Sequence, residues 1–380
     1  MDFDYQVAPV LILLIGILIL WLSLRRILSL RAKAARKSRR IAERIVLSLV
    51  LFFAFAITAC TSYNTAARLW FHAHHPRPGQ TYLVNGRKMY IECTGSGSPT
   101  IVLDAGLGND SVIWASVQPT LAKTTRVCAY DRAGFGRSQS RPAPRDADHI
   151  AAELHSLLIQ ANISRPIVLM GHSIAGVYMR DYAARYPEDL AGLVFVDGST
   201  PLQQDNPAFK AAGAGGGLPP WYVPMLFRAA FIVGIPRLIG RCSNHAAGPD
   251  DQAAQMQAED FCEMHAASSI GEAGSLEQSG QETVHSGPYG DLPILVFSHD
   301  PDKSMPNENA AQKKVELVWS QMQEDIKKLS TRSRRIIARN SGHYVQTERT
   351  DLIDKEVPLF IEQIRGAAPP PVTYGSTTTE

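Results

Sequence analysis

The sequence predicts an α/β domain in which helices cover both faces of a mainly parallel sheet, preceded by two apolar helices. Three observations support this fold class. Short apolar runs alternate with helix-compatible segments over residues 81–365, a serine between small residues follows one of these runs, and two long apolar runs stand before them. At 380 residues, one large domain with additional segments is expected, because single cores stop growing near about 250–300 residues.

Residues 1–60 are expected to form a membrane anchor of two helices joined by a basic loop. The apolar runs extend from Val7 to Leu24 and from Ile45 to Cys60. At about 1.5 Å per residue, the first run spans most of a hydrocarbon layer about 30 Å thick. The nine basic residues between the runs are Arg25, Arg26, Arg31, Lys33, Arg36, Lys37, Arg39, Arg40 and Arg44. The positive-inside tendency predicts a cytoplasmic loop and places the domain that follows the anchor outside the cytoplasm, with membrane lipid as a partner.

Two alternatives to this topology remain open. The second run reaches only about 24 Å as a helix, so it could lie on the membrane surface and leave the domain in the cytoplasm. The run also ends in Ile57-Thr58-Ala59-Cys60, which resembles a bacterial lipoprotein processing site and would make Cys60 the lipidated first residue of the mature protein. This second alternative changes the anchor but still leaves the domain outside the cytoplasm. The nine basic residues listed above lie within the anchor, and nothing downstream indicates a nucleic-acid-binding face.

Residues 61–80 are expected to be a polar linker, after which the α/β domain begins with a hairpin. Extended runs at Tyr82–Val84 and Lys88–Glu92 flank Asn85-Gly86, a pair that suits a tight turn. Six further runs are expected to be strands: Thr100–Leu103, Arg126–Tyr130, Ile167–Met170, Leu193–Val196, Ile294–Phe297 and Arg335–Ala338.

Two segments depart from the alternation of strands and helices. An insertion over about 200–290, apolar from Trp221 to Ile239, is expected to be a helical lid. Residues 366–380 are rich in Pro, Ser and Thr and are expected to be a disordered tail.

The chain has five cysteines. Cys242 and Cys262 lie in one segment and could pair in an oxidising compartment. Cys93 and Cys128 fall on expected strands, where we interpret them as two small buried apolar residues.

The residue at the centre of the candidate site is Ser173. It stands in Gly171-His172-Ser173-Ile174-Ala175-Gly176, between an apolar strand and an amphipathic helix. A serine on such a sharp turn projects above the sheet and requires small neighbours, which is typical of a nucleophile elbow. The usual pattern is G-x-S-x-G, and Ala175 replaces its last glycine.

A serine nucleophile needs a base and a carboxylate. His343 follows the last expected strand and is the expected base. For the acid, Asp302 has the expected spacing after the strand Ile294–Phe297 and is ranked first, followed by Asp300 and then by Asp197 at the end of the preceding strand. Backbone N–H groups of Leu107 and Ile174 are the expected oxyanion donors.

Together with the elbow, the segment Tyr130-Asp131-Arg132-Ala133-Gly134-Phe135-Gly136-Arg137-Ser138 resembles the α/β-hydrolase superfamily, over roughly residues 81–365. The resemblance implies an esterase, lipase, thioesterase or peptidase-like activity, and a serine nucleophile argues against the epoxide-hydrolase and dehalogenase branches. It implies no metal or organic cofactor, and the apolar lid favours a small lipophilic acyl substrate. Two other functions stay open: a peroxidase-like or lyase branch using the same triad, and a non-catalytic module that binds a hydrophobic ligand.

Overall fold

The computed structural model describes residues 7–29, 37–141, 144–213, 222–242, 252–262, 266–304, 308–368 and 374–380. These residues divide into two compact units, one of residues 1–76 with 222–263 and the other of residues 77–221 with 264–380. Four positions named in the sequence analysis lie outside the described residues: Arg31, Lys33 and Arg36 in the basic loop, and Trp221 at the start of the expected lid.

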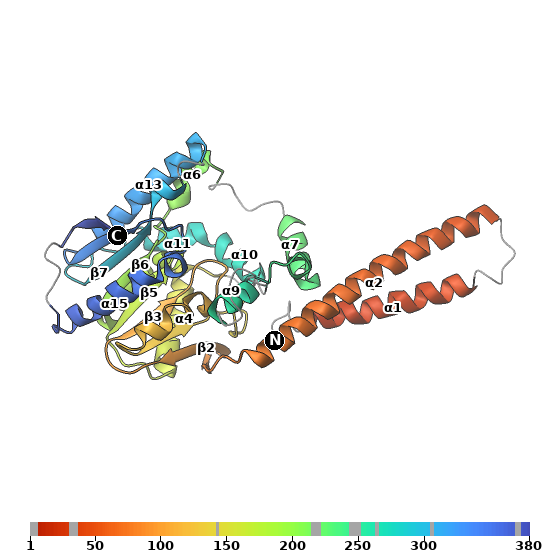
Figure 1. Ribbon diagram of the computed structural model, residues 1–380, viewed down its shortest axis with the longest axis horizontal. Helices are drawn as coiled ribbons and strands as arrows, with labels where there is room; N and C mark the ends of the chain where they lie inside the picture. Colours follow the sequence, from red (N-terminus) through yellow and green to blue (C-terminus); the bar gives the residue numbers. More distant parts are fainter. Residues whose placement is uncertain are drawn as a thin grey trace. The chain divides into compact units, whose positions relative to one another are not determined.

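Nine strands of the second unit form one sheet in the order β1-β2-β4-β3-β5-β6-β7-β8-β9 (Figure 1). Their bounds are Gln80–Val84, Arg87–Thr94, Thr100–Asp104, Val127–Tyr130, Ile167–His172, Leu190–Val196, Ile294–His299, Ser333–Ala338 and Thr377–Thr379 for β1 to β9. The pairs β1–β2 and β2–β4 are antiparallel, and all others are parallel. The predicted mainly parallel sheet is therefore confirmed, and each strand expected from the sequence is present.

Helices cover both faces of this sheet, because successive strand side chains point to opposite sides. One core contains Leu169 and Phe195 and packs against α4 (Ala147–Gln160), α5 (Ala175–Arg185) and α13 (Ala310–Lys327). The other contains Val168 and Val194 and packs against α3 (Gln118–Leu121), α14 (Val345–Glu348) and α15 (Thr350–Ile364). The remaining helices of this unit are η2 (Ser111–Trp114), η3 (Pro187–Asp189), η4 (Gln203–Asp205), α6 (Pro207–Ala211), α10 (Ala266–Gly274), α11 (Leu276–Thr283) and α12 (Pro301–Ser304).

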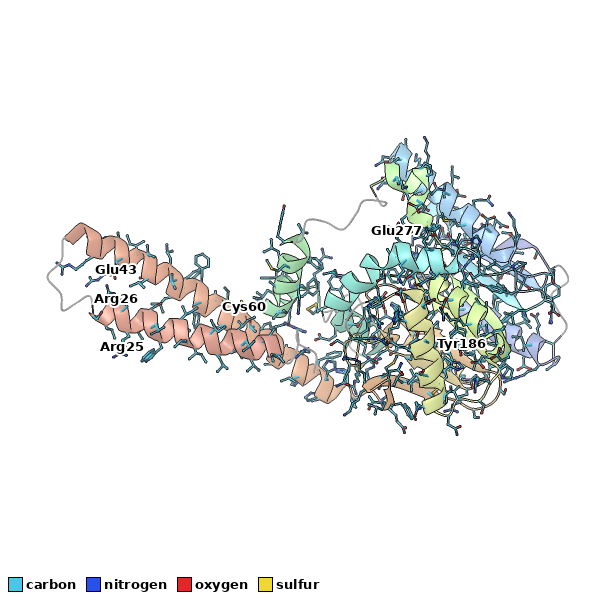
Figure 2. All side chains as sticks on the ribbon, turned by 180° about the vertical axis from the view of Figure 1, so that it is seen from behind. Arg25, Arg26, Glu43, Cys60, Tyr186 and Glu277 are labelled. Atoms are coloured by element: carbon cyan, nitrogen blue, oxygen red, sulfur yellow. A yellow bond between two sulfur atoms is a disulfide. The ribbon has the colours of Figure 1, made fainter. Side chains whose placement is uncertain are left out.

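The first unit is helical and is built on the antiparallel hairpin of α1 (Ala8–Ser29) and α2 (Lys37–His74), with α7 (Tyr222–Val233), α8 (Ile235–Leu238) and α9 (Gln252–Cys262). Arg26 and Glu43 form an ion pair of 2.7 Å at the loop end of the hairpin (Figure 2). The helix α1 and the stretch Arg40–His74 are both long and apolar enough to cross a membrane, judged by length and composition.

Three expectations about the chain's organisation need correction. The expected linker is largely helical, since α2 continues to His74. The expected disordered tail contains β9, which pairs in parallel with β8. The insertion is helical as expected, but it is divided between the two compact units. Residues 222–263 belong to the unit of the N-terminal hairpin, whereas the two ends of the insertion belong to the unit of the sheet.

The cysteines also differ in part from expectation. Cys242 and Cys262 form a disulfide, with Cα atoms 5.4 Å apart. Cys93 and Cys128 form a second one, which corrects their interpretation as free apolar residues. They lie directly opposite each other on the antiparallel strands β2 and β4, with Cα atoms 4.0 Å apart. Cys60 has a free thiol within α2, and its lipidation stays a prediction.

Candidate active site

Ser173 lies on the tight turn between β5 and α5. Its φ of 55° is unusual for a residue with a side chain, and the turn is held because Ser173 N donates to Val196 O at 3.1 Å and Ser199 N donates to Ser173 O at 2.7 Å. A Cβ at Gly171 would lie 2.8 Å from the Cβ of Ala175, and one at Gly176 would lie 2.8 Å from Ser199 O. Gly171 thus makes room for the methyl group of Ala175, and Gly176 allows the backbone of Ser199 to approach the turn closely.

A chain of hydrogen bonds connects Ser173 to a buried carboxylate. His343 Nε2 lies 2.9 Å from Ser173 Oγ, and His343 Nδ1 lies 2.6 Å from Asp197 Oδ2. Asp197 is fully buried, whereas 38% of the His343 side chain is exposed. The imidazole can therefore exchange protons with a bound molecule while its other nitrogen stays fixed by Asp197.

The carboxylate beside His343 is Asp197, which was ranked third from the sequence, and the preference for Asp302 is corrected. Asp302 is an exposed residue of α12. The oxygens of Asp300 accept hydrogen bonds from the backbone N–H groups of Asn340, at 2.9 Å, and Asp302, at 3.0 Å, so Asp300 organises the turn. Asp197 directly follows β6, where a φ of 47° turns the chain at the same sheet edge as the elbow.

Asp197 accepts four hydrogen bonds. Besides His343, its donors are His299 Nδ1 at 2.8 Å, His299 N at 3.1 Å and Trp319 Nε1 at 2.9 Å. Burial would raise the pKa of Asp197, but the hydrogen bonds from His299 and His343 outweigh it and hold the pKa well below its ordinary value. Asp197 is therefore an anion at neutral pH.

His299 lies between two carboxylates, because its Nε2 is 2.7 Å from Glu316 Oε2 while its Nδ1 faces Asp197. Burial would lower the pKa of His299, but these hydrogen bonds raise it to about 10. The sequence analysis assigned no role to His299, Glu316 or Trp319. A usable signal was present, since Glu316 and Trp319 are three residues apart and so lie on one face of a helix.

The two expected oxyanion donors stand near the elbow. Ile174 is the N-cap of α5, so its N–H has no partner within the helix. Leu107 lies in the turn after β3, where Asn109 N donates to Gly106 O at 3.2 Å, and its side chain is 38% exposed. Among the described residues, no hydrogen bond occupies the N–H of either residue. Their function as oxyanion donors stays a prediction.

His172, next to the serine, links the elbow to the loop of His343. It is fully buried, and its Nε2 lies 3.0 Å from His343 O. Burial and the neighbouring His343 lower the pKa of His172 to about 3, so the ring is neutral and donates this hydrogen bond. His172 thereby positions the backbone of the expected base.

Arg132 fixes the loop that carries Leu107. Its guanidinium donates to Ala105 O at 2.5 Å and to Gly106 O at 2.9 Å. It also pairs with Asp104 at 2.7 Å and, through two bonds of 2.8 and 2.9 Å, with Glu272. All three charged side chains are buried. The sequence analysis included Arg132 only in the segment that resembles the superfamily, and its partner Glu272 could not be inferred because it is distant in the chain.

The geometry agrees with a comparison against protein families, in which the model described as alpha/beta hydrolase fold matches residues 99–350. The chain belongs to the α/β-hydrolase family. Its structural neighbours include an esterase from Thermogutta terrifontis, an enol-lactonase from Burkholderia xenovorans and an epoxide hydrolase from Vigna radiata, at 18%, 19% and 15% identity. These identities support the fold alone.

Three relatives illustrate the range of similarity. The uncharacterized protein YqjL of Bacillus subtilis is 25% identical over 276 residues, which are 72% of this chain and 88% of YqjL. An uncharacterized protein of Schizosaccharomyces pombe is 32% identical over 163 residues, which are 35% of this chain but only 30% of that protein. The solved structure of a bacterial membrane phospholipase A is 22% identical with a TM-score of 0.55, covering 86% of this chain and 100% of that chain.

Replacement of Arg132 by methionine in this α/β-hydrolase should destabilise the protein by about 3–5 kcal/mol, because Asp104 and Glu272 would stay buried without their cation. Thermal and denaturant unfolding measure the change. Arg137→Met is the matched control, since Arg137 lies in the same turn but is exposed, and a change within about 0.5 kcal/mol is expected there. Equal losses in both variants would contradict the importance of the buried network.

The stability of the protein should depend on pH through His299. Because the pKa of His299 in the folded protein is raised to about 10, its stabilising effect is complete below about pH 6.5 and is lost as pH rises through about 10. Wild-type Tm should therefore fall more between pH 7 and about pH 10.5 than the Tm of a His299→Gln variant. Parallel pH profiles of the two proteins would mean that His299 is not charged in the folded state.

Proposed function

We propose that this α/β-hydrolase cleaves an ester or related acyl bond through a covalent acyl-enzyme on Ser173. The observation that carries the proposal is the continuous series of hydrogen bonds from Ser173 Oγ through both nitrogens of His343 to Asp197. It joins an alcohol, a base and a buried anion in the order that acyl transfer requires.

In the proposed reaction, Ser173 Oγ attacks the carbonyl carbon while its proton passes to His343 Nε2. The negative charge that develops on the carbonyl oxygen is met by the N–H groups of Leu107 and Ile174, each of which contributes about 2.7–4 kcal/mol in comparable enzymes. Asp197 stabilises the imidazolium through Nδ1. His343 then protonates the leaving alcohol, and a water molecule activated by the same nitrogen releases the acid and restores Ser173.

The proposed substrate is a lipophilic ester. Support comes from the apolar side chains of the insertion, among them Leu226, Phe227 and Phe231, and from the two apolar N-terminal helices. One solved structure of similar fold bears the description membrane phospholipase A, which makes an ester of a membrane lipid a reasonable class to test.

A fluorophosphonate probe tests the chemistry directly, because it reacts only with an activated serine. We expect the full chain to be labelled and the Ser173→Ala variant not to be. Ser199→Ala is a matched control, since this buried serine supports the elbow through its backbone N–H and should leave labelling intact. A folded wild-type protein that does not react would favour the alternative of a binding module without catalysis.

We also propose that α1 and α2 anchor the enzyme in a membrane, with the loop between them in the cytoplasm and the hydrolase domain outside. The basic residues around Arg25, Arg26 and Arg44 support this orientation, because moving each charge across a bilayer is costly. A reporter that is active only outside the cytoplasm, fused after residue 80, should be active. An inactive fusion, combined with an active cytoplasmic reporter at the same junction, would reverse the orientation.

A further inference from the structure

Helices α7 and α8 and the residue that follows them expose many large apolar side chains. Residues 222–239 include eight large apolar side chains with 40% or more of their area exposed: Tyr222, Val223, Met225, Leu226, Phe227, Ile235, Leu238 and Ile239. An exposed apolar patch of this kind usually marks a site of interaction with a protein or a membrane. We call these eight side chains the apolar face.

The segment that carries the apolar face is fixed to the N-terminal hairpin. Asn64 of α2 donates its amide hydrogens to Phe231 O at 3.1 Å and to Ile232 O at 3.3 Å, and its Oδ1 accepts from Arg237 Nε at 2.9 Å. Gly234 allows this approach, because a Cβ there would lie 2.5 Å from the Cβ of Asn64. Thr61 and Asn64 are buried. The helices α7 and α8 are therefore held in a definite position along α2.

That position corresponds to one end of the apolar hairpin. Glu43 of α2 pairs with Arg26 at the loop end, and Thr58 lies against Gly16 farther along. Asn64 is six residues beyond Thr58, a rise of about 9 Å. The contact with α7 is thus only four residues after the second apolar run ends at Cys60, at the end opposite the basic loop, as both views show (Figures 1 and 2).

The same end of the hairpin has other features of a membrane interface. Tyr63 and Trp70 of α2 are 55% and 60% exposed, and tyrosine and tryptophan are enriched where hydrocarbon meets water. Residues 222–242 also contain three arginines and no acidic residue. Arg237 pairs with Glu259 of α9, but the segment itself has no acidic side chain, and an apolar segment with basic residues is suited to a bilayer surface that carries anionic headgroups.

We infer that the apolar face of α7 and α8 rests in the lipid surface of the membrane that the hairpin crosses, on the side opposite the basic loop. This inference depends on the proposed membrane anchoring. The occupant is lipid because Asn64 fixes the segment to α2 four residues after the apolar run of the proposed anchor ends, close in the chain to the exposed Tyr63. The ion pair of Arg237 with Glu259 and the disulfide between Cys242 and Cys262 connect the segment to α9 and limit its freedom to leave the surface.

Spin-label accessibility in the full chain tests the inference. The protein, carrying Cys60→Ser, is reconstituted in vesicles of phosphatidylcholine and phosphatidylglycerol, and a nitroxide is attached to Leu226→Cys. Leu14→Cys reports the anchor, and Leu317→Cys is the matched control, because Leu317 of α13 is exposed to 60% and Leu226 to 61%. We expect labels at Leu226 and Leu14 to collide with oxygen in preference to a water-soluble nickel complex, and the label at Leu317 to show the reverse.

Each other outcome has a definite meaning. A label at Leu226 that behaves like the one at Leu317, while Leu14 is in lipid, would overturn the inference and leave the anchoring intact. Labels in water at both Leu226 and Leu14 would refute the anchoring itself. Spectral broadening at Leu226 that disappears on dilution with unlabelled protein would show that a second copy covers the face, which also overturns the inference. Leu238→Cys repeats the test on α8 if the first variant does not fold.

Discussion

Substitution of Ser173 by alanine is expected to lower kcat for a short-chain aryl ester by about 10⁴- to 10⁶-fold. The change removes one oxygen atom from a partly buried serine on a turn whose shape depends on backbone hydrogen bonds, so the unfolding temperature should stay close to wild type. Steady-state kinetics and thermal unfolding of the purified full chain measure the two quantities.

Variants of His343 and Ser199 test whether this loss of activity comes from Ser173 and His343 acting together. His343→Ala should be about as damaging as Ser173→Ala, and the double variant scarcely worse, because residues that act as one unit are strongly non-additive. Ser199→Ala should retain near wild-type turnover. Losses that add in the double variant would show that Ser173 and His343 act independently, and substantial turnover by Ser173→Ala would disprove its assignment as nucleophile.

The second large effect is expected at Asp197. Asp197→Asn should lower kcat by about 10⁴-fold, because the amide keeps the shape of the side chain but no longer stabilises the imidazolium or selects its tautomer. Asp302→Asn should have little effect, since Asp302 is exposed on α12. The two variants measured under the same conditions decide between the structural and the sequence-based ranking of the acid, and a loss confined to Asp302→Asn would favour the latter.

The sheet could be predicted well from the sequence because its strands are short apolar runs. The run Ile167–Met170, for example, needs no distant partner to be recognised, and Ser173 follows it on a turn that its small neighbours make possible. His343 could be placed for a similar reason. It follows the last apolar run, and the ends of parallel strands meet at one edge of a sheet.

The acid could not be chosen in this way because three aspartates follow strands at the same edge. The three aspartates differ in the hydrogen-bond donors that surround them, and these donors come from distant parts of the chain. Asp197 is surrounded by donors from β7, α13 and the loop of His343, whereas Asp300 is occupied by the N–H groups of Asn340 and Asp302. Strand-end position alone contains no information about such partners.

The disulfide between Cys93 and Cys128 escaped prediction for a related reason. Pairing of β2 with β4 skips β3 in the order of the chain, so local patterning does not reveal that the two cysteines are opposite. The strand β9 was missed because a polar run of threonines has no apolar signal. Its pairing depends on the backbone of β8.

That last strand has a consequence for solubility. An unpaired strand edge is a template on which another chain can add, and β8 would present such an edge if β9 were removed. In the folded protein, Glu380 N donates to Ile337 O at 3.0 Å and Arg339 N donates to Glu380 O at 2.8 Å. The new edge is only three exposed threonines long, and it is followed by a charged residue. A short polar strand is a poor template for pairing with another chain. By covering the edge of β8, β9 should therefore reduce edge-to-edge aggregation of the hydrolase sheet.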